Sequence, residues 1–339
     1  MLNANGRKNF TASGDKDAEN LLERVLMEIG NALSGTNLCV VLGGSYGRGE
    51  GGVRQDKENG ILYNDLDFFV FARKKPANAE LLLKEIAEKY EQLLKIDVDF
   101  SSVMSVRDIK NNAGRLMMQE LKRGYRLVCG EDLLAEYLPE IPAESLPFSE
   151  ACRLLLNRGM GLLLADEKIR KNSGDADFIL RNINKAILGV CDALLIVKKN
   201  YKWSIDERLK AVNESDLTDR FKEFYAMAVK FKKSPDRKVA DDLDKLRSEV
   251  RDMFRNCIKN ICGESYTLLC LNCKNSGEIS LKNFIKYCIK SRAIPVKNWQ
   301  WYTMPAVAAL LPELDQAFEK MSDKVITESK LYQQWLIFN

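Results

Sequence analysis

Two stretches of sequence decide the fold: LCVVLGGSYGRG at residues 38–49 and DLDFFVFA at residues 65–72. Each contains a short apolar run rich in β-branched and aromatic residues, which predicts a buried strand. The first run passes directly into Gly43, Gly44 and Ser45, which predict a tight turn in place of a longer strand. These two stretches therefore place a turn at the end of one predicted strand and two acidic residues at the start of the next.

The second strand begins with Asp65 and Asp67, where charge is least expected in an apolar run. Residues two apart on a strand point to the same face, so both carboxylates project together. Two like charges this close are unfavourable unless a cation lies between them. Asp97 and Asp99 repeat the arrangement on a third predicted strand, residues 96–100. If the two strands are neighbours, three or four carboxylates converge, and such oxygen-only donors favour Mg²⁺ or Mn²⁺.

The glycine turn suits a phosphate group. Gly43 and Gly44 let backbone N–H groups approach a phosphate closely, and a following helix start adds partial positive charge. The hydroxyl of Ser45 can donate to a phosphate oxygen, and Arg48 can add a charge-assisted donor. A Gly-Gly-Ser turn alone is usually only a turn, and Asp-x-Asp alone is usually a solvated feature. Their combination along the chain is much more specific and predicts a triphosphate site beside a metal site.

Around these motifs the order of elements predicts an α+β domain with a mixed sheet. Apolar spacing indicates helices from residue 17 to about 33 and over residues 79–94, and a short extended piece at residues 126–129. Prolines at 139, 142 and 147 mark a connector. We therefore expect a flexible leader at residues 1–16, a catalytic domain at 17–140 and a second domain at 141–339.

The second domain is predicted to be an all-α helical bundle, because its apolar spacing is helical almost throughout. The expected helices cover roughly residues 149–168, 176–200, 217–232, 237–262 and 281–291.

Composition excludes several chemistries. The 339 residues contain no histidine, which removes a Ser-His-Asp triad, a Cys-His dyad and His-ligated zinc. The formal net charge of +4 neither demands nor excludes nucleic acid. The sequence shows no secretory signal and no apolar run of about 18 residues. With nine scattered cysteines, these features favour a cytoplasmic protein with reduced thiols and no membrane partner.

The motif order resembles the DNA polymerase beta-like nucleotidyltransferase superfamily, especially its minimal and antibiotic-modifying members. The resemblance rests on Gly44-Ser45, on Asp65 and Asp67, and on a third acidic residue on a later strand. It implies that Asp65 and Asp67 bind both catalytic metals. It also implies that a third carboxylate binds the catalytic metal and helps to deprotonate the acceptor hydroxyl. Asp97 fits the apolar–acid–apolar form better than Asp99, and we favour it.

One departure from the family pattern is the segment between Ser45 and Asp65, which is longer than in many members. It suits an elongated loop over the triphosphate. If it is instead a disruption, phosphate binding is in doubt.

These features together predict transfer of a nucleoside monophosphate from an NTP, with ATP favoured, to an acceptor hydroxyl, with release of pyrophosphate. The active site is expected in a cleft between the domains. There Lys185 would neutralise the triphosphate by analogy with two-domain transferases, and Arg153, Asn157 and Arg158 are weaker candidates for contacts. A small-molecule acceptor is favoured. Protein-directed or RNA-directed transfer, synthesis of a nucleotide second messenger, and a non-catalytic nucleotide-binding, antitoxin-like module are the alternatives.

Two further groups of residues could bind a ligand, but a structural role is favoured for each. Four cysteines with the spacing C-x4-C-x7-C-x2-C could bind zinc, but buried free thiols are the favoured interpretation; they are Cys257, Cys262, Cys270 and Cys273. An aromatic cluster could stack on a base, but packing of the last helix is favoured; it consists of Trp299, Trp301 and Tyr302.

Overall fold

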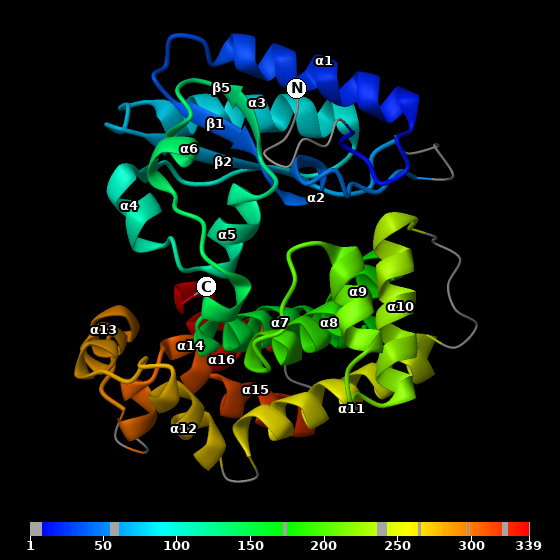
Figure 1. The fold of residues 1–339 in the computed structure, drawn as a ribbon. Helices are drawn as coiled ribbons and strands as arrows, with labels where there is room; N and C mark the ends of the chain where they lie inside the picture. Colours follow the sequence, from blue (N-terminus) through cyan, green and yellow to red (C-terminus); the bar gives the residue numbers. More distant parts are fainter. Residues whose placement is uncertain are drawn as a thin grey trace. The chain divides into compact units, whose positions relative to one another are not determined.

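The computed structural model describes residues 9–54, 61–171, 175–235, 243–263, 266–295, 297, 299–320 and 325–338. The chain forms two compact units: the first contains Met1–Pro142 and Lys230–Asp236, and the second contains Ala143–Val229 and Arg237–Asn339. A small mixed sheet with helices makes up the first unit, and helices make up the described part of the second (Figure 1). The return of Lys230–Asp236 to the first unit is not anticipated by the sequence, whose helical pattern runs on through that region.

The sheet is built around β1 (Cys39–Leu42). β2 (Leu66–Ala72) pairs antiparallel with one edge of β1, and β5 (Arg126–Cys129) pairs antiparallel with the other. β3 (Val98–Phe100) and β4 (Met104–Ser105) both pair parallel with β2, giving the order β3-β2-β1-β5. The predicted mixed sheet is therefore present, and the strand predicted at residues 96–100 is present as the shorter β3.

One face of the sheet is covered by α1 (Lys16–Ala32) and α3 (Ala79–Leu94) (Figure 1). The apolar side of each helix is buried against the sheet because its apolar residues recur at helical spacing. Asp15 caps α1 by accepting hydrogen bonds from the N–H groups of Asp17 and Ala18. Both helices agree with the sequence-based expectation.

The opposite face is covered by α4 (Val106–Asn111), α5 (Leu116–Lys122) and α6 (Leu133–Tyr137). β2 serves both layers because its side chains alternate. Leu66, Phe68 and Val70 pack toward α1 and α3, whereas Phe69 and Phe71 pack toward α4–α6. Asp67 alternates in step with Phe69, so its carboxylate leaves the sheet on the α4–α6 face.

The described part of the predicted flexible leader at residues 1–16 makes contacts with the rest of the first unit, and residues 1–8 lie outside the described residues. Phe10 and Thr11 are buried. The Glu19 carboxylate accepts hydrogen bonds from the N–H groups of Phe10 at 2.7 Å and Thr11 at 2.8 Å. The Arg126 guanidinium lies 4.0 Å from the centre of the Phe10 ring. These partners come from elsewhere in the fold, which is why the polar, glycine-bearing segment looked unstructured.

In the second unit α7 (Phe148–Arg170) and α8 (Ala176–Val197) pack along each other, and α11 (Leu243–Cys262) packs on α8. The helices expected at residues 149–168 and 176–200 are confirmed, as are α10 (Asp219–Lys233) and α13 (Leu281–Ser291). The helix expected at residues 237–262 is confirmed from Leu243 onward, and residues 237–242 lie outside the described residues. Shorter helices that the sequence pattern did not resolve are α9 (Ile205–Asn213), α12 (Thr267–Asn275), α14 (Ala306–Ala309), α15 (Leu311–Lys320) and α16 (Lys330–Phe338). Within the described ranges, no helix is both long and apolar enough to cross a bilayer.

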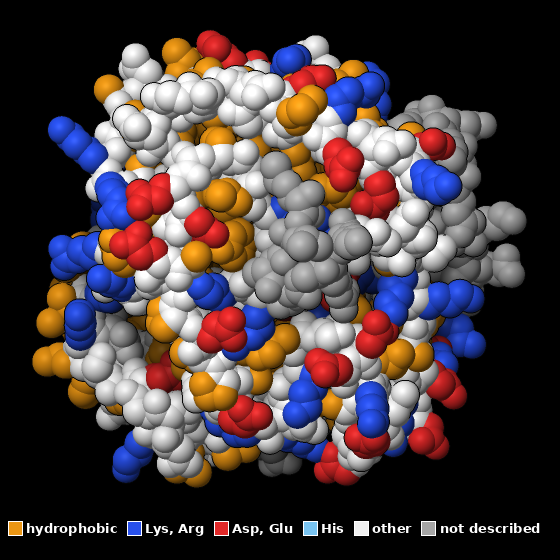
Figure 2. Space-filling view, turned by 45° about the horizontal axis from the view of Figure 1, so that its top comes forward, with side chains coloured by type: hydrophobic (Ala, Val, Ile, Leu, Met, Phe, Trp, Pro, Cys, Tyr) orange, Lys and Arg blue, Asp and Glu red, His pale blue; other side chains and the backbone are white. Residues whose placement is uncertain are grey.

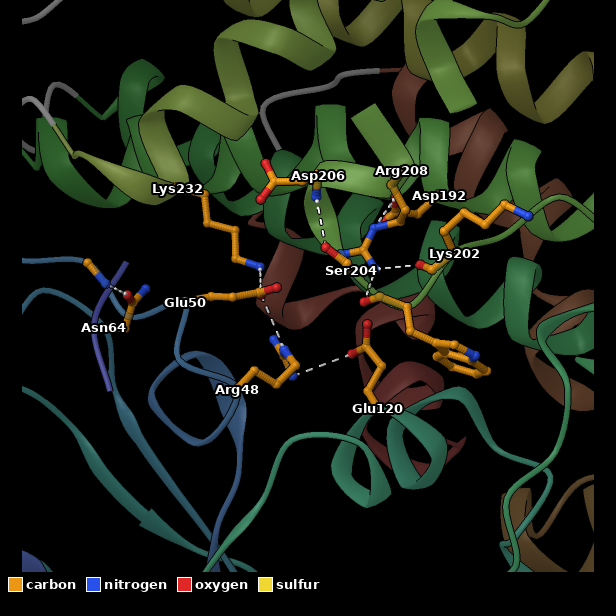
Figure 3. A network of polar contacts seen from close by, with 12 residues as sticks. Arg48, Glu50, Asn64, Glu120, Asp192, Lys202, Ser204, Asp206, Arg208 and Lys232 are labelled. Carbon is orange, nitrogen blue, oxygen red and sulfur yellow. Dashed lines mark hydrogen bonds and ion pairs between the residues drawn. The ribbon is translucent and has the colours of Figure 1, made fainter. Parts of the chain in front are cut away.

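A buried ion pair stabilises the second unit. The Nε atom of Arg208 lies 3.2 Å from Asp192 Oδ1, and its Nη1 donates to the carbonyl oxygen of Lys202 at 2.9 Å (Figure 3). The Tyr225 hydroxyl donates to the same Asp192 oxygen at 2.8 Å. Because Arg208 and Asp192 form an ion pair and each has a further hydrogen bond within the same unit, we assign them a structural role.

Candidate functional site

The site begins where β1 ends and the single turn of α2 (Gly44–Gly47) starts. The Gly43 N–H donates to the carbonyl oxygen of Asp67 at 2.8 Å. Gly44 has a φ of +58°, and a Cβ atom built on it would lie 2.0 Å from Asp67 Oδ2. Both the backbone conformation and the lack of space require glycine here. The predicted phosphate turn and the first predicted metal strand are therefore in direct contact.

Tyr46 connects the glycine turn by hydrogen bonds to the segment that precedes Asp65. Its fully buried hydroxyl donates to the carbonyl oxygen of Gly52 at 2.9 Å. The same oxygen accepts from the N–H groups of Tyr63 at 2.9 Å and Asn64 at 3.2 Å. Burial raises the pKa of Tyr46 far above its ordinary value, so the hydroxyl stays protonated.

Sequence analysis missed this role of Tyr46. An aromatic residue enclosed by glycines is the one available signal, and it does not reveal that three backbone groups converge on the hydroxyl. The ring also contacts Gly51, where an added Cβ atom would lie 2.0 Å from the Tyr46 Cδ1 atom.

The acidic strands lie side by side, as the sequence-based argument required. β2 and β3 pair in parallel with Asp67 opposite Asp99, and the Leu66 N–H donates to the carbonyl oxygen of Asp97 at 2.9 Å. Side chains at facing positions of parallel strands leave the sheet on the same face. Register therefore brings Asp99 beside Asp67 and leaves Asp97, the favoured third carboxylate, before the start of β3.

Negative charge is concentrated at this edge. Although Asp99 is exposed as a whole residue, partial desolvation of its carboxyl group raises its pKa, and the nearby carboxylates of Asp65 and Asp97 raise it further. Asp65 and Asp67 are half-buried, whereas Asp97 and Asp99 are exposed. Across the residues that the structure describes, no three Asp, Glu or Cys side chains lie close enough together to hold a metal ion. The backbone thus brings the predicted donors to neighbouring positions, and the metal set of Asp65, Asp67, Asp97 and Asp99 stays a prediction.

Arg48, predicted to contact phosphate, is engaged by carboxylates (Figure 3). Its Nε lies 3.4 Å from Glu50 Oε2, and its Nη1 lies 3.7 Å from Glu120 Oε2. Lys232, from the last turn of α10, places its Nζ 2.8 Å from the same Glu50 oxygen. Glu50 is only 5% exposed, so this carboxylate holds two cations beside the turn.

Glu50 and Lys232 were not among the sequence candidates. Glu50 follows the glycine motif closely, and an acidic residue there is no signal for phosphate binding. Lys232 is distant in sequence and sits in an ordinary amphipathic helix. Only the folded chain reveals that Arg48 and Lys232 share one partner.

The candidates from the helical half belong to the second unit. Lys185 is exposed on α8. Asn157 Oδ1 accepts a hydrogen bond from Trp335 Nε1 at 3.0 Å, and Arg153 Nε lies 3.3 Å from Glu150 Oε1. Arg158 packs against Gly189 of α8. Asn157, Arg153 and Arg158 therefore have contacts within their own unit, and the predicted role of Lys185 stays a prediction.

Comparison with known proteins identifies no relative. No family model, no curated protein and no solved structure matches the chain.

Among the described residues, the four cysteines considered for zinc do not form a group that could hold a metal ion. Cys257, Cys262 and Cys273 are buried, whereas Cys270 is exposed. Burial raises the pKa of Cys262 to about 12 and that of Cys257 well above its ordinary value. Zinc binds the thiolate, so protonated, buried thiols fit packing in the interior of the helical unit.

The rings of the aromatic cluster contact rings of the second unit that lie outside the last helix, which was the favoured partner, and Trp299 is 50% exposed. Trp301 makes an edge contact with Tyr266 at 5.8 Å, and Tyr302 packs on Tyr287 at 4.1 Å between ring centres.

Proposed function

We propose that this protein is a nucleotidyltransferase that transfers a nucleoside monophosphate from an NTP, with ATP favoured, to an acceptor hydroxyl and releases pyrophosphate. The observation that carries the proposal is the contact between Gly44 and Asp67. It joins a glycine turn, whose N–H groups suit phosphate, to a carboxylate, which suits a divalent cation. The resemblance of the motif order to the polymerase beta-like superfamily supports the same conclusion and a nucleotidyltransferase fold for the first unit.

The residues present fit Mg²⁺ or Mn²⁺. Their donors are all carboxylate oxygens, and the charge that raises the pKa of Asp99 is what a divalent cation would neutralise. Adjacent strands lie about 4.8 Å apart, so Asp67 and Asp99 can reach one ion by rotation about side-chain bonds. We assign the metal to Asp65, Asp67 and Asp99, with Asp97 as the alternative third ligand. When bound, the metal would neutralise charge on the triphosphate and the leaving pyrophosphate.

The protein's own groups would bind and orient the nucleotide. The N–H groups of Gly44 and Ser45 and the Ser45 hydroxyl would donate hydrogen bonds to phosphate oxygens, whereas the Gly43 N–H is taken by the Asp67 carbonyl oxygen. Arg48 and Lys232 would add positive charge, kept in place by Glu50. Catalysis by such a site is mainly positioning and charge neutralisation. We favour a small-molecule acceptor because the modest net charge provides no clear nucleic-acid track.

The test is transfer of label from each α-³²P-labelled NTP with Mg²⁺, with and without cell extract, alongside measurement of pyrophosphate release. Label on a small metabolite, on protein or on RNA identifies the acceptor class. Asp67→Asn should abolish transfer, and Asp252→Asn on α11, an exposed aspartate of the other unit, is the matched control. Transfer that persists in Asp67→Asn would place the chemistry elsewhere.

Calorimetric titration with ATP distinguishes the main alternative. A non-catalytic nucleotide-binding module would bind ATP and release no pyrophosphate under any acceptor condition. A transferase would show both binding and release, and Asp67→Asn would reduce the release.

A further inference from the structure

α13 presents an apolar stripe to its surroundings. Leu281, Ile285 and Ile289 follow each other at intervals of four residues, which places them on one side of the helix. Leu281 is 65% exposed and Ile289 is 71% exposed. Exposed aliphatic side chains in a row on one helix are unusual for a face that contacts only water.

A basic stripe runs beside the apolar one. Lys282, Lys286 and Lys290 each follow one residue after a member of the apolar stripe and are all exposed. Because successive residues are about 100° apart around a helix, the lysines border the apolar stripe along its whole length. We call the two stripes together the α13 face; it consists of Leu281, Lys282, Ile285, Lys286, Ile289 and Lys290.

The charged residues in and after α13 are all basic over a long stretch of the sequence. No Asp or Glu occurs between Glu278 and Glu313, whereas Arg292 and Lys297 extend the basic series beyond the helix. Ile294, 75% exposed, extends the apolar series in the same direction. In Figure 2 hydrophobic and basic side chains lie together at the left-hand edge, on the side where Figure 1 places α13.

The side of α13 opposite the α13 face packs against the rest of the second unit. The α13 face is therefore not the side that this helix uses to join its own unit. Tyr287 is buried and stacks on Phe338 of α16 with 5.4 Å between ring centres. Its hydroxyl accepts a hydrogen bond from Gln334 Nε2 at 2.7 Å. Phe284 makes an edge contact with Trp299 at 6.3 Å. These contacts fix which side of the helix points outward.

We propose that the α13 face docks on the surface of a bilayer that contains anionic phospholipids. A helix lying in the interface buries apolar side chains at the level of the headgroups, and lysines beside them contact lipid phosphates. Aliphatic side chains favour lipid over single-stranded nucleic acid, because nucleic acid is bound by stacking on aromatic rings. The continuous positive charge is complementary to an anionic leaflet.

This inference does not depend on nucleotidyl transfer. It departs from the sequence-based expectation of no membrane partner, which rested on the absence of an apolar run long enough to span a bilayer. Docking on a surface needs no such run, because the apolar side chains enter only the interface.

The test is co-sedimentation of the full chain with vesicles. The vesicles contain phosphatidylcholine alone, or phosphatidylcholine in which about a third of the lipid is phosphatidylglycerol, to set the surface charge. We expect binding to the anionic vesicles only and release as salt is raised, because salt screens the attraction of exposed charges.

Two variants separate the stripes. Lys282→Gln with Lys286→Gln should weaken binding about thirtyfold, given the contribution of each lysine near an anionic surface. Ile285→Ser with Ile289→Ser should weaken it more than about tenfold, because apolar burial is lost. The matched control is Leu81→Ser with Lys84→Gln on α3, where both side chains are also exposed; it should bind as the unmodified protein does. All these changes are at exposed positions, and circular dichroism checks that each variant is folded.

Several outcomes would overturn the proposal. They are failure to bind anionic vesicles, equal binding to neutral vesicles, and binding that neither variant weakens. Binding of single-stranded RNA without vesicle binding would make the α13 face a nucleic-acid surface. Self-association that Ile289→Ser abolishes, again without vesicle binding, would make it an interface between copies of the chain.

Discussion

Asp67 and Asp99 face each other across the parallel pairing of β2 and β3. Their side chains leave the sheet on one face, and the Asp67 carboxylate also contacts Gly44 of the turn after β1. Three segments that are separate in sequence therefore meet around one carboxylate. If the protein transfers nucleotides, this meeting point is where a cation and a phosphate group would be brought together.

The register yields a prediction about the third carboxylate. Asp99→Asn should reduce label transfer by about a hundredfold or more, a size typical of losing a group that stabilises charge in the transition state. Asp97→Asn should reduce it much less, because Asp97 precedes β3 whereas Asp99 faces Asp67 in the strand pairing. Both variants are compared at saturating NTP and Mg²⁺. The opposite ranking of the two variants would return the third position to Asp97.

Gly44→Ala should damage both stability and activity. The positive φ costs an alanine about 1–2 kcal/mol, and the new Cβ would displace the Asp67 carboxylate. Gly35→Ala is the matched control, since Gly35 has a φ of +80° with open space around it. Urea unfolding should show a similar backbone cost in both variants and an additional loss for Gly44→Ala. Full label transfer by Gly44→Ala would contradict the role assigned to this contact.

Tyr46→Phe tests the hydroxyl that connects the turn to the segment before Asp65. The change leaves the N–H groups of Tyr63 and Asn64 and the Gly52 carbonyl without this partner in a buried place. The free energy of unfolding should fall by roughly 1–3 kcal/mol. Tyr137→Phe removes a hydroxyl that accepts from exposed Arg73, and it should have little effect. If both variants lost the same free energy of unfolding, the three hydrogen bonds of the Tyr46 hydroxyl would contribute no more than an exposed one.

Glu50→Gln should destabilise the first unit. It removes the charge that Arg48 and Lys232 share at a nearly buried site, and breaking such a pair costs roughly 3–5 kcal/mol. Glu80→Gln, which breaks the exposed pair with Lys75, should leave the unfolding midpoint unchanged. Raised salt should not reproduce the effect of Glu50→Gln, because a buried pair is poorly screened.

Glu278 should make stability depend on pH. Burial raises the pKa of its carboxyl, although hydrogen bonds from Ser149 oppose the shift. A raised folded-state pKa means that the contribution to stability is complete below the unfolded value of about 4.3 and is lost as pH rises through the folded value. At pH 7 Glu278→Gln should therefore have the higher unfolding midpoint. The difference should shrink toward pH 4, whereas exposed Glu319→Gln should show no such trend.

Local pattern accounts for much of this protein. Alternation along residues 65–72 predicts a strand with Asp65 and Asp67 on one face, and helical spacing predicts α1, α3, α7, α8 and α13. The Gly-Gly-Ser turn is equally local. Such features are readable because they depend on backbone sterics and on periods of two or 3.6 residues, both carried by neighbours in the chain.

Strand register and the contacts between residues distant in sequence depend on the tertiary structure. The sequence could not choose Asp99 over Asp97 as the neighbour of Asp67, because strand register depends on pairing between separate segments. It could not show that Lys232 shares Glu50 with Arg48, or that Glu19 and Arg126 order the segment at Phe10. Ion pairs, hydrogen bonds and ring contacts between distant residues leave no period in the sequence, so they exist only once the chain has folded.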